Sequence, residues 1–381
     1  MSASVPNHLH VGSRIQVGKD RATVRFIGTV KDTKGDWLGV EWDDPNRGKH
    51  NGTHQGTEYF SCRYPASGSF IRFHSEKVMT GITFMDALEA RYLTRDGDIS
   101  TIHERHYDKT KDIGELYFGG NRQIVVETYG FDKIQKAQRQ LNSLKVVGLA
   151  EHLISSAGTN IKEAQLTIED LDLSRDLIAD WDTVFDIISQ LPHLKTLRLN
   201  QSRLSCPNIK LKSFQLSMLS LNQTLIAWQH IDILAAALPQ LQDLHLGGNE
   251  LSQLGEFKFP HLKHLNLEDN LISDWSGQIN KLSDALPSLE TLYLNNNRLK
   301  SIDIPADGMF PHLAVLRIEC NSIDNWKSLN ELNKLSNLTK LRCKKNPIFE
   351  GMDKELEAAH IVGRIKSLSN VNGNTVSLFC F

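Results

Sequence analysis

The feature that most constrains the fold of this chain is a leucine pattern that recurs along its C-terminal part. The pattern reads Leu-x-x-Leu-x-Leu-x-x-Asn-x-Leu, with substitutions at some positions. Successive copies are separated by roughly 24 residues on average, which is the spacing of leucine-rich repeats. The copies start at Leu144, Ile168, Leu194, Leu216, Leu241, Leu262, Leu289, Leu313 and Leu338.

Each copy predicts one short strand followed by one turn. The Leu-x-Leu step suits a strand whose alternate side chains point inward, and an Asn side chain can both donate to and accept from turn backbone. The last five copies keep Asn at this position, whereas the earlier ones carry His, Asp, Ser or Thr. Because one unit cannot bury its apolar face alone, the units are expected to stack. We therefore predict an α/β leucine-rich-repeat solenoid of about nine units over residues 141–370.

Tryptophan also recurs, just past the turn of four copies. The segments that follow, such as 181–191 and 326–335, are amphipathic and are predicted to be helices, with Asp or Asn residues before them as caps. A ligand-binding row of indoles is one interpretation, and core packing at the start of each helix is the preferred one. The four residues are Trp181, Trp228, Trp275 and Trp326.

The N-terminal part differs sharply in composition. Residues 1–140 contain only five leucines, against 45 in residues 141–381, and residues 1–81 contain 10 of the 25 glycines. Short β-branched and aromatic runs between these glycines predict a small, strongly bent, β-barrel-like domain over residues 10–81. Residues 82–140 are polar and irregular, and are predicted to be a connector with a helix near 84–93 and a strand near 123–128. The chain is thus expected to be multi-domain.

Composition also argues against several functions. The net charge of -2 gives no basic excess for nucleic acid, and no apolar run is long enough for a membrane span. Five scattered cysteines without a Cys-x-x-Cys motif favour a reducing, cytoplasmic compartment. The segment His103-Glu104-Arg105-His106 has the wrong spacing for a helical zinc pair. We therefore expect no enzyme activity, catalytic residue, cofactor or metal, and no nucleic-acid or membrane partner.

The N-terminal domain is similar to a CAP-Gly domain. The resemblance rests on four segments in the family's spacing, and the hallmark of the family is a Gly-Lys-Asn-Asp-Gly loop. It implies binding of acidic tails that end in Glu-Glu-Tyr or Glu-Glu-Phe with a free carboxylate, as on α-tubulin and some microtubule plus-end proteins. The segments are Trp37–Asp43, Gly48–Gly52, Tyr59-Phe60 and Gly68–Arg72.

The same resemblance implies which residues bind the tail. Backbone N–H groups of the loop and the Lys49 cation suit carboxylates, and Trp37 with Phe70 would line an apolar groove for the terminal ring. The loop departs from the hallmark, because the usual Asn and Asp are replaced. Turn formation alone is the alternative role for its glycines. The implied tail-binding residues are Trp37, Gly48, Lys49, His50, Asn51, Gly52 and Phe70.

A CAP-Gly domain followed by leucine-rich repeats resembles the tubulin-specific chaperone E family, also called tubulin-folding cofactor E. The resemblance implies a non-catalytic, cytoskeleton-associated protein that binds α-tubulin through its tail and its body. It would act with tubulin-folding cofactors B, C and D in assembly and dissociation of the αβ-tubulin heterodimer. The alternative is a microtubule plus-end adaptor or scaffold. Family members normally continue into a ubiquitin-like domain, whereas residues 371–381 are expected to be a short C-terminal tail without one.

The repeats offer a second candidate surface. The residue between the two inward positions of each Leu-x-Leu step should face outward. In the later repeats these positions collect positive charge around a tyrosine, which suits an acidic partner such as tubulin. A solvated face with no partner is the alternative. The candidate docking residues are Tyr293, Arg317, Lys340, Arg342 and Lys344.

Overall fold

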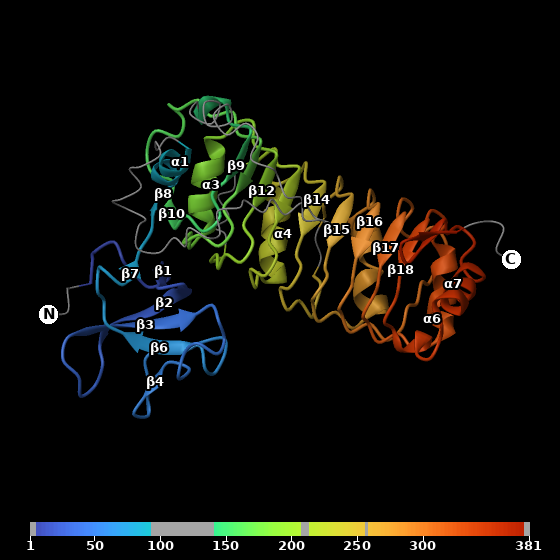
Figure 1. The fold of residues 1–381 in the computed structure, drawn as a ribbon, viewed down its shortest axis with the longest axis horizontal. Coiled ribbons are helices and arrows are strands. Elements are labelled where there is room, and N and C mark those ends of the chain that lie inside the picture. The colour runs from blue at the N-terminus through green and yellow to red at the C-terminus, as the bar shows by residue number, and fades with distance from the viewer. Residues whose placement is uncertain (1–4, 93–140, 207–212, 256–257, 377–381) are drawn as a thin grey trace. The chain divides into compact units, whose positions relative to one another are not determined.

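The computed structural model describes residues 5–92, 141–206, 213–255 and 258–376. The chain separates into two compact units (Figure 1). The first contains residues 1–168, 176–179 and 183–193, and the second contains residues 169–175, 180–182 and 194–381. The strand expected near 123–128, most of the expected connector and the last five residues of the expected tail lie outside the described residues.

The N-terminal sheet of the first unit is five-stranded and antiparallel. Its order is β6-β3-β2-β1-β7, with a separate hairpin formed by β4 and β5. Alternate apolar residues, among them Ile15, Val24, Leu38 and Val40, form its buried core. The outer strands β6 and β7 are not paired with each other among the described residues, so closure into a barrel stays a prediction. The strands are β1 (Arg14–Val17), β2 (Asp20–Thr29), β3 (Asp36–Trp42), β4 (Thr53–His54), β5 (Thr57–Glu58), β6 (Gly68–Ile71) and β7 (Val78–Met79).

The start of the expected connector is ordered as a strand and a helix. Strand β8 (Ile82–Thr83) pairs in parallel with β10 (Ile154–Ser156), and helix α1 (Phe84–Tyr92) follows at the place predicted for a helix. Thr83 begins this helix, because its Oγ1 accepts a hydrogen bond from Asp86 N at 3.1 Å. The first unit also contains the 3-10 turn η2 (Leu141–Ser143) and strand β9 (Val146–Gly148).

The second unit contains the repeat strands. Neighbouring strands from β11 to β19 are parallel, β20 is antiparallel to β19, and each central leucine of β11 to β18 faces that of the next strand. These leucines are buried and the residues beside them are more exposed. The strands are β11 (Asp170–Asp172), β12 (Thr196–Arg198), β13 (Met218–Ser220), β14 (Asp243–His245), β15 (His264–Asn266), β16 (Thr291–Tyr293), β17 (Val315–Arg317), β18 (Lys340–Arg342), β19 (Asn370–Val371) and β20 (Asn374–Thr375).

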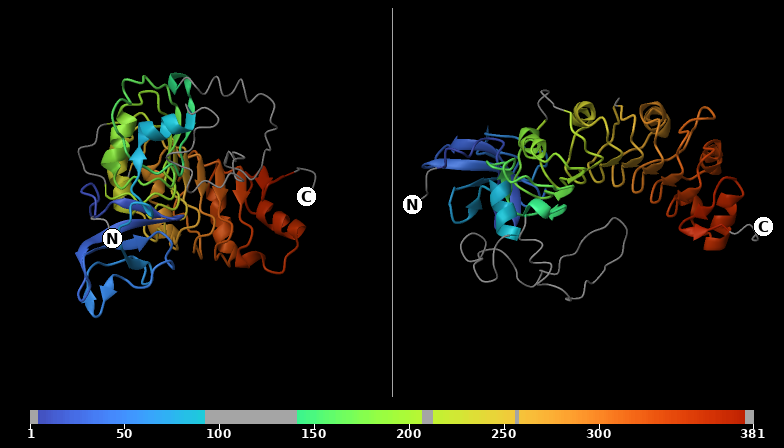
Figure 2. Two further views of the ribbon diagram at one scale, coloured as in Figure 1. Left: turned by 60° about the vertical axis from the view of Figure 1, so that its left-hand side comes forward. Right: turned by 90° about the horizontal axis from the view of Figure 1, so that it is seen from above.

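Helical segments follow the strands, and the yellow and orange turns line up along one side of the strands of the second unit (Figure 2). Three of the four recurring tryptophans are buried at the start of a helix, which agrees with the core-packing interpretation. No described helix is long and apolar enough to cross a membrane. The segments are α3 (Trp181–Ser189), α4 (Trp228–Ala237), the π-helical turn η3 (Trp275–Ile279), α5 (Leu282–Ala285), α6 (Trp326–Glu331), η4 (Leu332–Lys334), η5 (Pro347–Phe349) and α7 (Lys354–Val362).

A ladder of buried asparagines connects successive repeats. Asn270 Nδ2 donates to the carbonyl oxygens of Leu267, in its own repeat, and of Leu246, in the preceding repeat, both at 3.0 Å. Its Oδ1 accepts from the backbone N–H groups of Asn249 and Leu251, at 3.1 and 3.0 Å. Each neighbouring copy makes the same kind of link to the repeat before it. The ladder consists of Asn249, Asn270, Asn297, Asn321 and Asn346.

Replacing Asn270 with Leu is expected to destabilise the repeats. Two backbone N–H groups would lose their partner in a dry interior, and each such unpaired group costs about 1–3 kcal/mol. We expect the free energy of unfolding, measured by urea denaturation, to fall by about 3 kcal/mol or more. The matched control is Gln253→Leu at an exposed site of the same repeat region, which should stay within about 0.5 kcal/mol. Equal losses in the two variants would contradict a structural role of the ladder.

Candidate functional site

The loop 48–52 is held by its backbone against the edge strand β6. The N–H groups of Lys49 and His50 donate to the carbonyl oxygen of Gly68 at 2.8 and 3.3 Å, and Gly68 N donates to His50 O at 2.7 Å. The side chains of Lys49 and Asn51 are exposed. The loop therefore presents a cation and an amide to solvent from a fixed backbone.

Two glycines of the loop are required because backbone atoms of other segments lie too close to leave room for a side chain. Gly52 has φ +107°, and a Cβ there would lie 1.8 Å from the carbonyl oxygen of Phe60. A Cβ at Gly48 would lie 2.5 Å from the carbonyl oxygen of Gly68. Both glycines thus determine the path of the loop backbone. This steric role corresponds to turn formation, the alternative role that the sequence analysis gave for these glycines.

His50 stands where the family hallmark has Asn, and its ring is part of the loop's own structure. The Nδ1 atom accepts a hydrogen bond from Gly52 N at 3.0 Å. Burial and, second, the charge of His54 lower the pKa of His50 below its ordinary value, so the ring is neutral at pH 7. A neutral ring whose Nδ1 accepts carries its proton on Nε2. His50 therefore offers one further N–H donor beside the loop.

Phe70 is the centre of an aromatic cluster on this edge of the sheet. It lies on β6, is half-buried, and has His50 at 5.1 Å between ring centroids and Trp37 at 6.5 Å. Four rings that were not among the predicted site residues complete the cluster. Two of them, Tyr59 and Phe60, belong to the segments that carry the family resemblance, so that motif was the available signal. The four rings and their centroid distances from Phe70 are Phe26 (6.2 Å), His54 (6.1 Å), Tyr59 (5.5 Å) and Phe60 (5.4 Å).

Trp37 is fixed from two sides. Its Nε1 donates to Thr33 Oγ1 at 2.8 Å, and the guanidinium of Arg72 lies 3.8 Å from the ring centroid. Arg72 in turn donates to the carbonyl oxygen of Asp36 at 2.8 Å. The hydrogen bond to Thr33 thus orients the indole edge-on to Phe70. The structure therefore brings together Trp37 and Phe70, the two residues predicted to line the groove.

The acidic residues of the motif that contains Trp37 have structural roles. Glu41 accepts from Arg25 Nε at 2.8 Å and from the backbone N–H of Arg63 at 2.6 Å. Asp43 pairs with Arg14, whose side chain is fully buried, at 2.7 Å. These pairs fix the end of β3 and the chain that leads into β6, and they leave the acidic groups unavailable to repel an acidic ligand.

The second candidate surface lies on the outward positions of strands β16 to β18. Arg342 is exposed as expected, whereas Arg317 is half-buried, because its guanidinium lies 3.9 Å from the centroid of the Tyr293 ring. Arg317 and Arg342 face each other across β17 and β18. Lys340 is exposed and Lys344 half-buried on the same part of the chain. Arg317, Arg342 and Tyr293 therefore form one row across three neighbouring strands.

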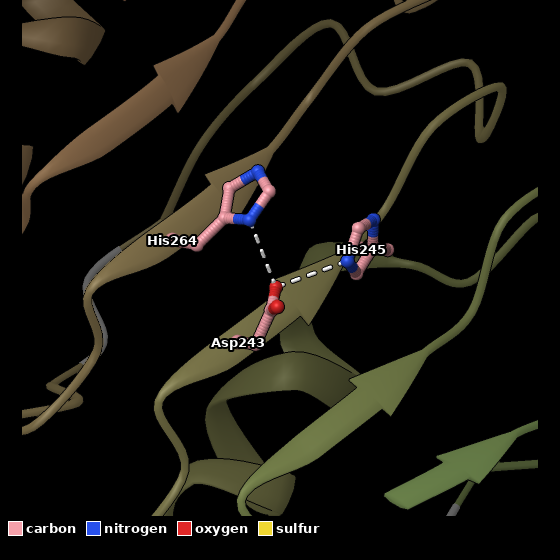
Figure 3. Close-up of side chains that lie close together, drawn as sticks. All are labelled: Asp243, His245 and His264. Carbon is pink, nitrogen blue, oxygen red and sulfur yellow. Dashed lines mark ion pairs between the residues drawn. The ribbon is translucent and has the colours of Figure 1, made fainter. Parts of the chain in front are cut away.

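The same face carries a cluster that the sequence did not predict as a site. Asp243 and His245 on β14 lie beside His264 on β15 (Figure 3). His245 occupies the outward position of its Leu-x-Leu step, and Asp243 and His264 occupy the same position in successive copies of the repeat. The signal was the repeat register, which places Asp243 opposite His264.

Two family models match the two parts of the chain. The family model of the CAP-Gly domain matches residues 11–75, and that of leucine-rich repeats in two copies matches residues 287–331. A solved structure described as "Bik1 CAP-Gly domain with ETF peptide from Bim1" shares 35% identity, covers 16% of this chain and 75% of that chain, and gives a TM-score of 0.16.

Relatives from several organisms match nearly the whole chain. "Tubulin-specific chaperone E" of Homo sapiens is 38% identical over 377 residues, covering 94% of this chain and 68% of the relative. "Tubulin-folding cofactor E" of Arabidopsis thaliana is 34% identical over 387 residues, covering 96% and 70%. The chain therefore belongs to the tubulin-specific chaperone E family.

Proposed function

We propose that this chain is a non-enzymatic tubulin-folding cofactor that binds α-tubulin at two places. The relatives are named as a tubulin-specific chaperone and a tubulin-folding cofactor, which supports the general role. The observation that carries the proposal is the juxtaposition of the exposed Lys49 and the His50 N–H donor with the aromatic cluster around Phe70. Such a site suits a peptide that is acidic and ends in an aromatic residue.

The acidic C-terminal tail of α-tubulin would bind at the loop 48–52. Lys49 supplies a charge for the glutamates or the terminal carboxylate, and the neutral His50 ring and the Asn51 amide supply hydrogen-bond donors. The terminal tyrosine ring would pack on the half-buried edge of the cluster formed by Phe70 and Trp37. Because the aromatic ring stands at the end of the tail and the glutamates precede it, this arrangement would also fix the direction of the tail.

The repeats would form a solenoid whose strand face binds the body of tubulin. The row of Tyr293, Arg317 and Arg342 offers positive charge beside an aromatic ring, which suits an acidic protein. Once the tail is bound, the second contact becomes intramolecular, so two weak contacts give a tight complex. In this role the protein would act in the cytoplasm with cofactors B, C and D in assembling and dissociating the αβ-tubulin heterodimer.

This function is tested by comparing binding of the chain to soluble tubulin with its binding to polymerised microtubules. A folding cofactor should co-elute with soluble tubulin in gel filtration and should stay in the supernatant when polymerised microtubules are pelleted. A plus-end adaptor should instead pellet with microtubules and show little binding to the free dimer. Co-sedimentation with polymer without capture of soluble tubulin would reject the cofactor proposal.

Removing the loop cation should weaken binding of the tail. We expect Lys49→Ala to raise the dissociation constant for a peptide ending in Glu-Glu-Tyr about ten-fold or more, since a charge-assisted contact contributes about 1.5–3 kcal/mol. Fluorescence anisotropy with a labelled peptide measures the change. Lys77→Ala is the matched control, because this exposed lysine precedes β7 at the opposite edge of the sheet. Equal affinities of the two variants would show that Lys49 does not take part in binding the tail.

Reversing charge on the strand face tests the second contact. We expect Arg317→Glu with Arg342→Glu to weaken binding to tubulin that lacks its C-terminal tail, and the difference from wild type to shrink at high salt. The fold should be retained, because the two side chains lie on the outer face and the stacking of Arg317 on Tyr293 contributes only about 0.5–1 kcal/mol.

The matched control for the strand face is Lys327→Glu with Lys354→Glu, which makes the same change of charge at exposed sites on α6 and α7. Surface-plasmon resonance compares the two double variants. Identical affinities would show that only net charge matters and would move the docking site away from the row of Tyr293, Arg317 and Arg342.

A further inference from the structure

Three potential metal ligands converge on the outer face of β14 and β15. Asp243 and His245 are two residues apart on β14, so strand alternation puts both side chains on one face. The register places Asp243 directly opposite His264 on β15. As Figure 3 shows, both imidazoles reach the same carboxylate oxygen: Asp243 Oδ1 lies 3.0 Å from His245 Nε2 and 3.3 Å from His264 Nδ1.

These contacts are close but do not have the alignment of hydrogen bonds. Asp243 Oδ1 is buried and has no aligned donor, and the second ring nitrogen of His264, Nε2, is also buried without a hydrogen-bond partner. An N–H that donated to the carboxylate would point at the oxygen. Ligand atoms of one metal ion have the same kind of arrangement, because each of them points at the metal and not at the other ligands.

The rings of the cluster are restrained by their neighbours. The His264 ring packs edge-on against His245 at 5.1 Å and against Tyr293 at 4.7 Å between ring centroids. The site is therefore partly organised before any ligand arrives.

A comparison on the same face shows that this cluster is not an ordinary ion pair. Asp170 on β11 is paired with the guanidinium of Arg198 on β12, which neutralises it fully at neutral pH. Among the described residues, Asp243 has ion-pair contacts only with the two imidazoles. No guanidinium or ammonium group in the described part of the chain pairs with Asp243, so a metal cation would supply the positive charge that Arg198 supplies to Asp170.

We propose that Asp243, His245 and His264 bind one Zn²⁺ ion. Two imidazole nitrogens and one carboxylate are ligands that zinc accepts, at bond lengths of about 2.0–2.2 Å. In a tetrahedron of that size, the ligand atoms are about 3.3 Å apart, and one ligand atom from each of the three residues already lies within 4.8 Å of the others. Small side-chain rotations would complete the site.

Three protein ligands leave the fourth position of a tetrahedral zinc ion open. The cluster lies on the outer face of the strands and its side chains are only half-buried, so this position would hold water or accept a carboxylate or imidazole of a docked protein. The zinc site itself does not depend on the proposed binding of tubulin.

Metal titration of the purified, metal-free chain tests the proposal. We expect isothermal titration calorimetry to show one Zn²⁺ bound per chain, and an excess of Mg²⁺ or Ca²⁺, which prefer oxygen ligands, to leave binding unchanged. The double variant His245→Gln with His264→Gln should bind at least about ten-fold more weakly. The matched control is His312→Gln, at an exposed histidine of a later repeat, and it should bind as the wild type does. Absence of zinc binding by the wild type, or equal binding by the double variant, would overturn the proposal.

Two further measurements keep the test independent of the stability of the variants. The absorption spectrum of the Co²⁺-loaded wild type should show tetrahedral nitrogen and oxygen coordination, and thiolate bands would instead assign binding to cysteines such as Cys206. Crystals of the zinc-loaded wild type should give an anomalous peak between the three side chains. A peak elsewhere, with none at this position, would refute the site.

Discussion

The repeats depend on the hydrogen bonds of the buried asparagines. At the end of each strand the chain turns away, and backbone groups of two successive turns lose their sheet partners. One Asn amide serves both, donating to carbonyls of its own and the preceding repeat while accepting an N–H. Because this link recurs in the five later repeats, the leucines of their adjacent strands stay opposite each other and the outward residues form straight rows.

These rows determine which side chains lie next to each other on the strand face. Each outward side chain is determined by its own repeat, but its neighbours come from repeats about 24 residues away. The register therefore brings Arg317 beside Arg342 and Asp243 beside His264. Tyr293 lies between these two groups, packing on the His264 ring and under Arg317. Any partner that docks on the basic row would thus also approach the histidine cluster.

The N-terminal domain holds an exposed loop rigid without a large core. Glycines allow the loop 48–52 to lie directly on backbone of β6 and near Phe60, and His50 closes the turn through Gly52. The same compact packing gathers rings around Phe70 from strands and loops that are far apart in sequence. Rigid backbone, one cation and a half-buried aromatic edge are the features that the proposed recognition of a flexible tail requires.

The sequence by itself determined the elements that depend on local period and motif. The repeat spacing placed the strands, the central leucines, the Asn positions and most tryptophans correctly, because burial of one face must recur with each turn of chain. The glycine loop with Lys49 was likewise readable from its motif. Only the tertiary structure decided which side chains meet: Phe26 and Tyr59 around Phe70, Arg317 stacked on Tyr293, and two histidines on one carboxylate. These contacts join residues from different strands or loops, and cross-strand register is a property of the folded sheet that no single repeat encodes.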